Sequence, residues 1–456
     1  MDSSANRFAR KRKLQLQPAQ IIAISFALII LLGAGLLCLP VASRSGASCG
    51  FLPALFTATS ATCVTGLTLF DTWTQWSGFG QVVLLCLIEV GGLGFMTAAS
   101  LVIFLLRKKV GLRERLVMAQ ALSVNDMDGV IRLQKWVLFG SLSIQFAGAL
   151  VLFFRFLPEF GWENAAKWGV FHSISAFCNA GFDILGCLQP GGSMMVFRDD
   201  PVVLLTLIAL IGLGGLGFFV WEEVVRLHSW KKFSVYTKLV LLASTVLLLG
   251  GAVLICLLEW NNPATLGAMP VWQKLLNGLF QSMTVRTAGF AAVDQAGLTD
   301  GGKVVSMVLM LIGGSSGSTA GGMKTVTALA LFLFVLARVR GRAKVCVFKR
   351  TIPAGQVMDA MTISFIMVGL AITGAVLVSV WSPVGFLDSL YESISAIATV
   401  GLTSGVTPVL TLPGKLLIIV YMYFGRVGVL TLSLGFLMGD KAQERFQYAN
   451  TNLLIG

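Results

Sequence analysis

The sequence has little charge, little histidine and no closely paired cysteines. Only 12% of its 456 residues are Asp, Glu, Lys or Arg, whereas 56% are hydrophobic and the mean hydropathy is +0.84. A soluble domain usually carries about twice that charged fraction. The eight cysteines form no CxxC pair, so they indicate neither a zinc site nor a disulfide framework. With two histidines and no HExxH motif, the sequence offers no constellation for a membrane enzyme either. We therefore expect a protein that is not an enzyme.

Long apolar runs are what the sequence has in abundance. A membrane-crossing helix needs roughly 20 mostly apolar residues. Eight runs meet this criterion, at 20–39, 79–105, 134–157, 201–225, 235–258, 303–337, 356–381 and 414–438. The first is too long for a cleavable signal peptide, and no small-residue cleavage site follows it. An even number of spans places both termini on one side of the membrane.

The basic residues identify that side. The net charge is +13, and most of the 34 Lys and Arg residues lie in the N-terminal arm, after the second, fourth and sixth runs, and in the tail. All of these segments fall on one face of an eight-span protein, which the positive-inside rule makes cytoplasmic. The charge therefore reports membrane topology with both termini in the cytoplasm, and it does not indicate nucleic-acid binding.

One unit occurs four times along the chain. Each outer segment holds a half-length apolar stretch that is too short to cross the membrane and ends at a glycine. Such internal repetition is the strongest organisational signal in the sequence. It predicts an all-α membrane protein with eight transmembrane spans, in which four helix–pore helix–helix units surround a central ion pathway. The stretches run from Leu55 to Leu67, Val170 to Phe182, Leu279 to Phe290 and Leu390 to Leu402, and close at Gly66, Gly181, Gly289 and Gly401.

The glycine-ended turns suggest how an ion crosses. Irregular backbone at membrane depth is tolerated only where protein buries it or a water-filled cavity meets it. Glycine permits positive φ and close backbone approach, so stacked carbonyls can replace the hydration shell of a cation. Each half-helix also aims its negative C-terminal end at the turn. One alternative is that the short helices are re-entrant packing elements. Another is a sodium-coupled secondary transporter of a small solute, which would need two inverted halves.

Five motifs carry a resemblance to a known family: TSATCVTGL, FHSISAFCNAGF, RTAGF, IGGSSGSTAGGMKT and ATVGLTSG. With them the chain resembles the superfamily of Ktr, Trk and plant high-affinity potassium transporters, and most closely the bacterial Ktr-type potassium-uptake membrane subunit. The resemblance implies potassium uptake across the bacterial plasma (inner) membrane. It divides the chain into a cytoplasmic arm (1–17), repeats at 18–107, 134–227, 235–338 and 355–438, and a cytoplasmic tail (439–456).

The resemblance also assigns a potassium filter, made by the closing glycine of each repeat and the residues before it. None of the four turns reads like the full five-residue signature of a potassium channel, which leaves the preference over sodium open. Arg286 is expected to brace the third turn or to pair with a carboxylate rather than to contact the ion. The filter residues are Cys63, Val64, Thr65 and Gly66; Cys178, Asn179, Ala180 and Gly181; Thr287, Ala288 and Gly289; and Ala398, Thr399, Val400 and Gly401.

A glycine-rich stretch at 313–325 interrupts the sixth apolar run. A helix loses roughly 1 kcal/mol per glycine relative to alanine, so the stretch is predicted to unwind. Arg426 lies inside the eighth run, where an arginine costs at least about 2.5 kcal/mol and usually faces a cavity or a partner. The resemblance implies that an intramembrane loop at 313–322 and Arg426 form a gate below the filter. A kinked packing helix, and a structural pairing of Arg426, stay open as alternatives. The gate residues are Gly313, Gly314, Ser315, Ser316, Gly317, Ser318, Thr319, Gly321, Gly322, Lys324 and Arg426.

The expected partners also follow from the resemblance. It implies a homodimer in the lipid membrane and a cytosolic nucleotide-binding ring of the RCK type (KtrA-like). A nucleotide would act only through that ring, because we expect no cofactor bound by this chain. Potassium is the transported ion, and sodium is a candidate activator or symported ion. Four carboxylates near the outer mouth, Asp71, Asp183, Asp294 and Asp388, either raise the local cation concentration or are solvated loop residues.

Overall fold

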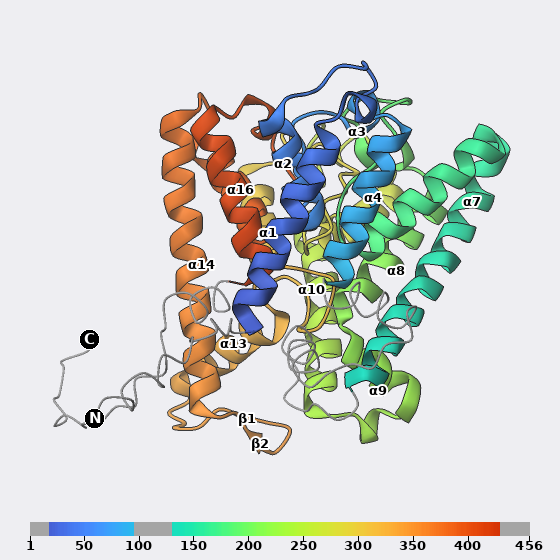
Figure 1. The fold of residues 1–456 in the computed structure, drawn as a ribbon. Coiled ribbons are helices and arrows are strands. Elements are labelled where there is room, and N and C mark those ends of the chain that lie inside the picture. The colour runs from blue at the N-terminus through green and yellow to red at the C-terminus, as the bar shows by residue number, and fades with distance from the viewer. Residues whose placement is uncertain (1–17, 95–129, 429–456) are drawn as a thin grey trace, which may run out of the picture.

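The computed structural model describes residues 18–94 and 130–428, and in these ranges the chain is mostly helical (Figure 1). The expected cytoplasmic arm at 1–17 and tail at 439–456 lie outside the described residues, as do the ends of the second and eighth apolar runs. The remaining apolar runs and all four half-length stretches lie within them.

The helices fall into four successive units. The first has α1 (Pro18–Leu37), α2 (Phe51–Thr62), the short α3 (Thr72–Gln75) and α4 (Gly78–Leu93), and the second has α7 (Val130–Phe177), α8 (Pro201–Leu216) and α9 (Phe218–Leu227). The third has α10 (Val235–Glu259), α11 (Val271–Thr284), α12 (Asp300–Leu311) and α13 (Thr325–Val339), and the fourth has α14 (Ala354–Trp381), α15 (Phe386–Ile397) and α16 (Leu412–Val427). Short 3₁₀ turns lie at Pro40–Ala42, Ser193–Phe197, Trp230–Lys232 and Thr407–Val409, and a hairpin of β1 (Cys346–Val347) and β2 (Arg350–Thr351) precedes α14.

Several helices begin at a residue whose side chain caps the first turn. Ser234 Oγ accepts a hydrogen bond from the Thr237 N–H at 3.2 Å at the start of α10, and Thr299 Oγ1 accepts one from Gly302 at 3.0 Å at the start of α12. Such caps satisfy N–H groups that have no partner within the helix. Asp200 does the same ahead of α8, where its carboxylate accepts the Val202 N–H at 2.9 Å. The sequence thereby fixes where these helices start.

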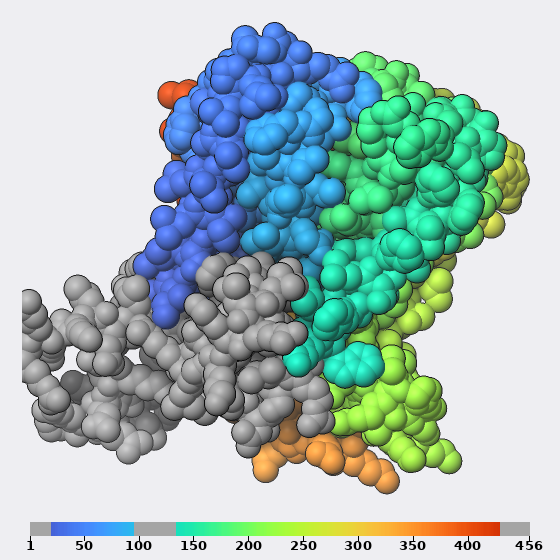
Figure 2. Space-filling model, turned by 45° about the vertical axis from the view of Figure 1, so that its right-hand side comes forward, coloured from blue at the N-terminus to red at the C-terminus, as the bar shows by residue number. Residues whose placement is uncertain are grey.

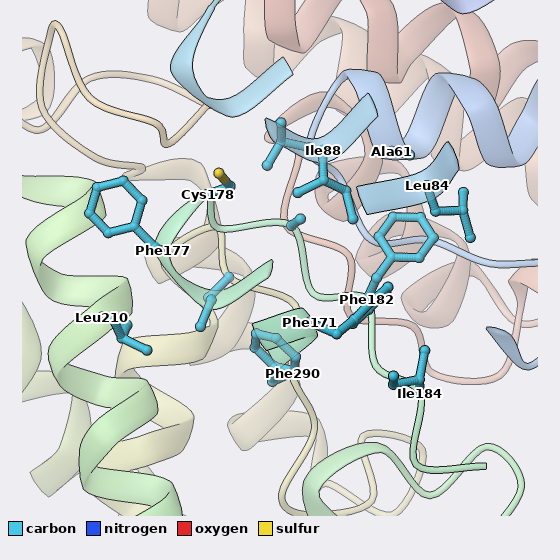
Figure 3. Close-up of a cluster of buried hydrophobic side chains, with 14 of the residues drawn as sticks. Ala61, Leu84, Ile88, Phe171, Phe177, Cys178, Phe182, Ile184, Leu210 and Phe290 are labelled. Atoms are coloured by element: carbon cyan, nitrogen blue, oxygen red, sulfur yellow. The ribbon is translucent and has the colours of Figure 1, made fainter. Parts of the chain in front are cut away.

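The half-helices lie inside the bundle. They are α2, the second part of α7, α11 and α15, and each carries an aromatic residue at the same position of the repeat. Figure 3 shows Phe171 and Phe182 of the second unit near Leu84 and Ile88 of α4, with Phe290 of the third unit close by. Because apolar residues of three units meet there, the turns that follow the half-helices are held in a packed interior. The aromatic residues at the repeated position are Phe56, Phe171, Phe280 and Tyr391, all buried.

Two expected spans differ from single straight helices. The run at 201–225 is not one helix, because α8 and α9 meet at Gly217 with a bend of 96°. Gly217 has φ 92° and ψ 143°, a conformation that is essentially restricted to glycine. The sixth run is interrupted as predicted, since α12 ends at Leu311 and α13 begins at Thr325. We call residues 312–324 the glycine-rich loop.

The expected span at 134–157 and the half-helix after it are joined in α7. Gly161, with φ 74° and ψ 167°, breaks the helical backbone between them, so α7 doubles back on itself. Among the described residues, four helices are long and apolar enough to cross a membrane, or five if α8 and α9 count as one bent span. On the face shown in Figure 2, α1 and α4 lie side by side with α7 next to them.

Candidate functional site

Four turns with one backbone conformation follow the four half-helices. We call them the glycine turns: residues 63–66, 178–181, 286–289 and 398–401. The closing glycine has positive φ in every turn, at 97° for Gly66, 69° for Gly181, 82° for Gly289 and 94° for Gly401. The residue two before each glycine also has positive φ, which is uncommon for non-glycine residues. These residues are Val64 (φ 55°), Asn179 (60°), Thr287 (67°) and Thr399 (52°).

The four glycine turns close into a ring. A Cβ placed on Gly66 would lie 2.6 Å from the carbonyl oxygen of Ala180, and one on Gly181 would lie 2.7 Å from that of Ala288. The pattern continues around the ring, since a Cβ on Gly289 would lie 2.6 Å from the Val400 oxygen, and one on Gly401 would collide with the Thr65 oxygen. Each glycine thus meets the carbonyl that precedes the next glycine. The backbone of all four repeats comes together at one place, as the repeat predicts.

A hydroxyl residue near the end of each half-helix fixes its turn. Ser60 Oγ accepts the Gly66 N–H at 3.1 Å, and Ser395 Oγ accepts the Gly401 N–H at 3.1 Å. In the other two units the hydroxyl instead donates to the residue after the glycine: Ser175 to the Phe182 carbonyl and Thr284 to the Phe290 carbonyl, both at 2.7 Å. Sequence reasoning missed these four residues. An alignment of the four repeats would have shown a hydroxyl at this position in each.

The backbone of the same residues accepts a second bond. The N–H groups of Thr65, Ala180 and Val400 donate to the carbonyls of Ser60, Ser175 and Ser395, each at 2.8 Å. In the third unit, which is one residue shorter, both Ala288 and Gly289 donate to Thr284, at 2.9 and 3.4 Å. Most N–H groups of the glycine turns thereby bond within their own unit.

A second repeated position holds the segments on the outer side of the ring. It is occupied by Thr57, His172, Gln281 and Glu392, all of them buried. His172 Nε2 accepts the Ile184 N–H at 3.4 Å, and Gln281 Nε2 donates to Gln295 Oε1 at 2.7 Å. Glu392 accepts hydrogen bonds from Thr403, at 2.7 Å, and from Thr407. In the second, third and fourth units these buried contacts keep the outer segment against its half-helix, whereas Thr57 Oγ1 donates to the Pro53 carbonyl of its own helix at 2.9 Å.

An outer cavity of about 270 Å³ opens on the ring and includes all four closing glycines in its wall. Three of the four expected carboxylates line it: Asp71, Asp183 and Asp294. Asp183 lies in the outer segment after the second turn, where burial, with a smaller contribution from Asp71, raises its pKa to about 6. Asp388 is not part of this wall and forms an ion pair with Lys303 at 2.7 Å. The acidic wall favours cations over anions at the outer entrance.

The glycine-rich loop lies directly against the fourth glycine turn. A Cβ on Gly322 would be 3.1 Å from the Ala398 oxygen, and one on Gly321 would collide with the Thr399 hydroxyl. The ends of the loop are joined, since Gly313 N–H donates to the Met323 carbonyl at 2.9 Å.

The GGSSG spacing at 313–317 also matches the GxSxG nucleophile elbow of hydrolases. That motif needs a preceding strand, whereas this segment follows the helix α12.

The α8–α9 bend holds the other side of the loop. Ser315 and Thr319 donate their N–H groups to the carbonyls of Gly215, at 3.0 Å, and Gly214, at 3.2 Å. The Phe218 N–H donates to Gly317 at 2.8 Å, and the Tyr236 hydroxyl donates to the Ser316 carbonyl at 3.1 Å. Within the loop, Ser318 Oγ donates to the Ser315 carbonyl at 2.6 Å. The loop is therefore held by backbone bonds to the second unit and by the Tyr236 hydroxyl of α10.

Arg426 connects the loop to the first unit. Its guanidinium donates to the Thr319 carbonyl, to the Gly91 carbonyl, and at 3.0 Å to the Gly92 carbonyl. Gly91 and Gly92 belong to the last turn of α4, whose unpaired carbonyls favour a positive charge. Lys324, which ends the loop, donates to the Ala320 carbonyl at 2.8 Å. Two basic side chains thus lie at the glycine-rich loop and bind backbone oxygens.

Arg286 is the first residue of the third glycine turn. It is buried and donates to the Ser244 carbonyl of α10 at 3.3 Å, and in the described residues it forms no ion pair. It lines a small cavity of about 190 Å³ with Asn179 and Gly314. Of the two roles expected for Arg286, the contact to α10 fits the brace of the third turn.

Long apolar helices around buried irregular backbone, together with a ring of converging carbonyls below an acidic cavity, define a membrane transport protein for cations. The chain belongs to the TrkH family of cation transport proteins, whose family model matches residues 4–445. It is a transporter and not an enzyme. The expected membership of the Ktr/Trk superfamily is thereby confirmed.

Two curated relatives match over nearly the whole chain. The potassium/sodium uptake protein NtpJ of Enterococcus hirae is 40% identical over 452 residues, which cover 98% of this chain and 99% of that protein. The Ktr system potassium uptake protein B of Bacillus subtilis is 40% identical over 429 residues, covering 94% and 95% of the two chains. The crystal structure of the potassium transporter TrkH from Vibrio parahaemolyticus shares the fold, with a TM-score of 0.70 at 18% identity over 93% of this chain and 86% of that one.

Proposed function

We propose that the chain takes up potassium across the bacterial plasma membrane through the ring of the four glycine turns. The observation that carries the proposal is the closed ring, in which each glycine meets the carbonyl before the next glycine. The ring offers backbone oxygens rather than charged side chains. This is the ligand set that replaces the hydration shell of potassium in channel filters. The potassium uptake named for two relatives supports the same ion.

Sodium is the second ion of this proposal. One relative is named a potassium/sodium uptake protein, and the closing glycine is the one residue that all four glycine turns share. A ring built from four different turns coordinates an ion less uniformly than a ring built from four identical turns. We therefore expect the preference for potassium over sodium to be moderate, and sodium to pass or to activate transport.

Fluxes of rubidium and sodium into liposomes that carry the purified protein test the filter. In the Gly289→Ser variant the added Cβ meets the Val400 oxygen at 2.6 Å, and the residue is forced to φ 82°. We expect the variant to lose the preference for rubidium. Gly405→Ser is the matched control, because Gly405 has φ 90° but open space around it. An unchanged preference in a folded Gly289→Ser protein would contradict the proposed filter.

We also propose that the glycine-rich loop and Arg426 form a gate on the cytoplasmic side of the ring. The loop lies against the fourth turn, and Arg426 ties it to the end of α4. Replacing Arg426 by alanine removes these bonds, so we expect a higher cation flux. Arg426→Lys keeps the charge but not the forked geometry of the guanidinium, so its cation flux should lie between those of wild type and Arg426→Ala. An unchanged flux in Arg426→Ala would argue against the gate.

The cytosolic regulation is proposed to come from a second protein. The name of one relative, a Ktr system protein B, supports a multi-subunit system. We propose a homodimer bound to a cytosolic nucleotide-binding ring of the RCK type, with both termini and the basic segments on the cytoplasmic side. Size measurement of the purified protein with and without an added ring tests both points. A monomer that binds no ring would contradict them.

A further inference from the structure

An apolar groove of about 700 Å³ runs along the bend between α8 and α9. Its wall is formed by the first turns of α7, by both sides of the bend, and by Leu241 of α10. Trp136, Phe139 and Trp221 contribute aromatic rings. Lys135 is the charged residue in the wall and lies near the start of α7. The groove therefore has a long apolar wall with one positively charged side chain, Lys135, at one end.

The length of α8 indicates how deep the groove lies in the membrane. α8 has 16 residues, which corresponds to roughly 24 Å of helix, whereas the hydrocarbon core of a bilayer is about 30 Å thick. With the start of α8 at the outer edge of the hydrocarbon core, the bend at Gly217 lies inside that core, and we infer that the apolar groove beside it faces acyl chains. Arg226 follows Val225 of the wall directly, and Lys238 lies one helical turn before Leu241. Basic residues near the cytoplasmic surface attract anionic lipid.

The same bend holds the glycine-rich loop. Gly214, Gly215 and Phe218 bind the loop through their backbones, and their neighbours Leu213, Leu216 and Val220 form the wall of the groove. Trp221 closes the arrangement, because its Nε1 donates to the Leu213 carbonyl at 3.0 Å across the bend. Whatever fills the groove packs against the residues that set the bend angle, and so it acts on the bonds that hold the loop.

We propose that this groove binds an acyl chain of an anionic phospholipid from the cytoplasmic leaflet, and that the bound lipid stabilises the bend that holds the glycine-rich loop. The apolar wall takes the chain, while Lys135 and the basic residues beside it attract the head group. The effect on transport rests on the proposed function, whereas the binding of the lipid does not.

Gly140→Leu tests the binding, because it fills the groove without disturbing the fold. Gly140 lies in α7, and a Cβ there meets only the Trp221 ring, at 3.9 and 4.0 Å, which is ordinary contact. The larger side chain displaces about two methylene groups of the lipid, which corresponds to roughly a tenfold loss of affinity. Gly250→Leu is the matched control on the membrane-facing side of α10, where nothing lies within 4 Å. Lys135→Gln removes the positive end while leaving the apolar wall.

Native mass spectrometry of the full-length protein, with phosphatidylglycerol or phosphatidylcholine of the same acyl chains, gives the readout. We expect wild type and Gly250→Leu to retain phosphatidylglycerol, Gly140→Leu to retain about tenfold less, and Lys135→Gln to lose the preference between the two lipids. Wild-type protein that retains no phospholipid would overturn the proposal, including the case in which a segment of this chain outside the described residues fills the groove. Equal retention by Gly140→Leu, or no preference in wild type, would also overturn it.

Rubidium flux in liposomes of the two lipids tests the link to the loop. We expect phosphatidylglycerol to lower the flux of wild type and of Gly250→Leu, and to have no such effect on Gly140→Leu. Equal lipid dependence in Gly140→Leu would refute the link. Absence of flux in every lipid, with phosphatidylglycerol still bound, would count against the proposed function and leave the lipid site supported.

Discussion

The hydroxyl groups behind the glycine turns should control ion preference. Ser395 Oγ accepts the Gly401 N–H at 3.1 Å, and both residues are buried. In Ser395→Ala this N–H loses its partner in the protein interior, which costs about 1–3 kcal/mol. The Val400 carbonyl, whose oxygen lies next to Gly289 in the ring, belongs to the same peptide unit as that N–H. We expect its orientation to relax when the N–H is no longer held.

The expected change can be bounded from that energy. If about 1.4 kcal/mol of the lost stabilisation appears as a difference between potassium and sodium binding, the preference falls about tenfold. The Ser60→Ala variant removes the equivalent bond to Gly66, 3.1 Å long, and should have a similar effect. The assay is the rubidium-to-sodium uptake ratio in liposomes, with a thermal unfolding curve to show that each variant is folded.

Ser389→Ala supplies the control. Ser389 is a buried residue of the same helix, and its Oγ donates to the Gly385 carbonyl at 2.9 Å, which also accepts the Ser389 N–H at 3.0 Å. Its loss leaves no donor or acceptor of the backbone unpaired. We expect normal ion preference in this variant. A folded Ser395→Ala protein with the preference of wild type would refute the role of the hydroxyl groups.

Three further changes test other parts of the pathway. Gly217→Ala places a Cβ 2.9 Å from the Ser316 oxygen at φ 92°, a strain of about 1–3 kcal/mol. We therefore expect the glycine-rich loop to be held more weakly and the rubidium flux to be higher. Gly46→Ala, in open space at φ 70°, is the control and should leave the flux unchanged. Burial raises the pKa of Asp183 to about 6, so its carboxylate is charged above that pH and neutral below it. The KM for rubidium should therefore rise when the pH is lowered from 7 to 5. Asp183→Asn lacks the charge and should have the high KM at both pH values. Lys324→Met removes the hydrogen bond from Lys324 Nζ to the Ala320 carbonyl, 2.8 Å long, which loosens the glycine-rich loop, so we expect a higher flux; an unchanged or lower flux would contradict this role of Lys324.

The sequence was sufficient to predict how the four turns are placed. Gly66, Gly181, Gly289 and Gly401 are the residues that every copy shares, and glycine is required where backbones approach closely at positive φ. The interruption of the sixth apolar run was also predictable, because glycines weaken a helix locally. In both cases the backbone conformation is determined by the glycine itself and by its sequence neighbours, so the sequence pattern is enough to predict it.

Other features depend on residues far apart in the chain. The bend at Gly217 is held by bonds to the glycine-rich loop, a hundred residues further on, while the run at 201–225 reads as one apolar helix. The partners of Arg426 are likewise invisible in sequence, because they are backbone carbonyls of Gly91, Gly92 and Thr319. Any residue type supplies a carbonyl, so no composition signal marks an acceptor of this kind.

Joining the four units in one polypeptide has a genetic consequence. In a ring of four identical subunits, one codon change alters all four walls at once, and a useful change in one wall is harmful if the others cannot tolerate it. Here each unit has its own codons, so the third unit can carry the glycine-rich loop and a half-helix one residue shorter, although the other three units do not share that shortening. Selection can therefore adjust one quarter of the ring at a time, and ion preference can drift in small steps rather than in jumps.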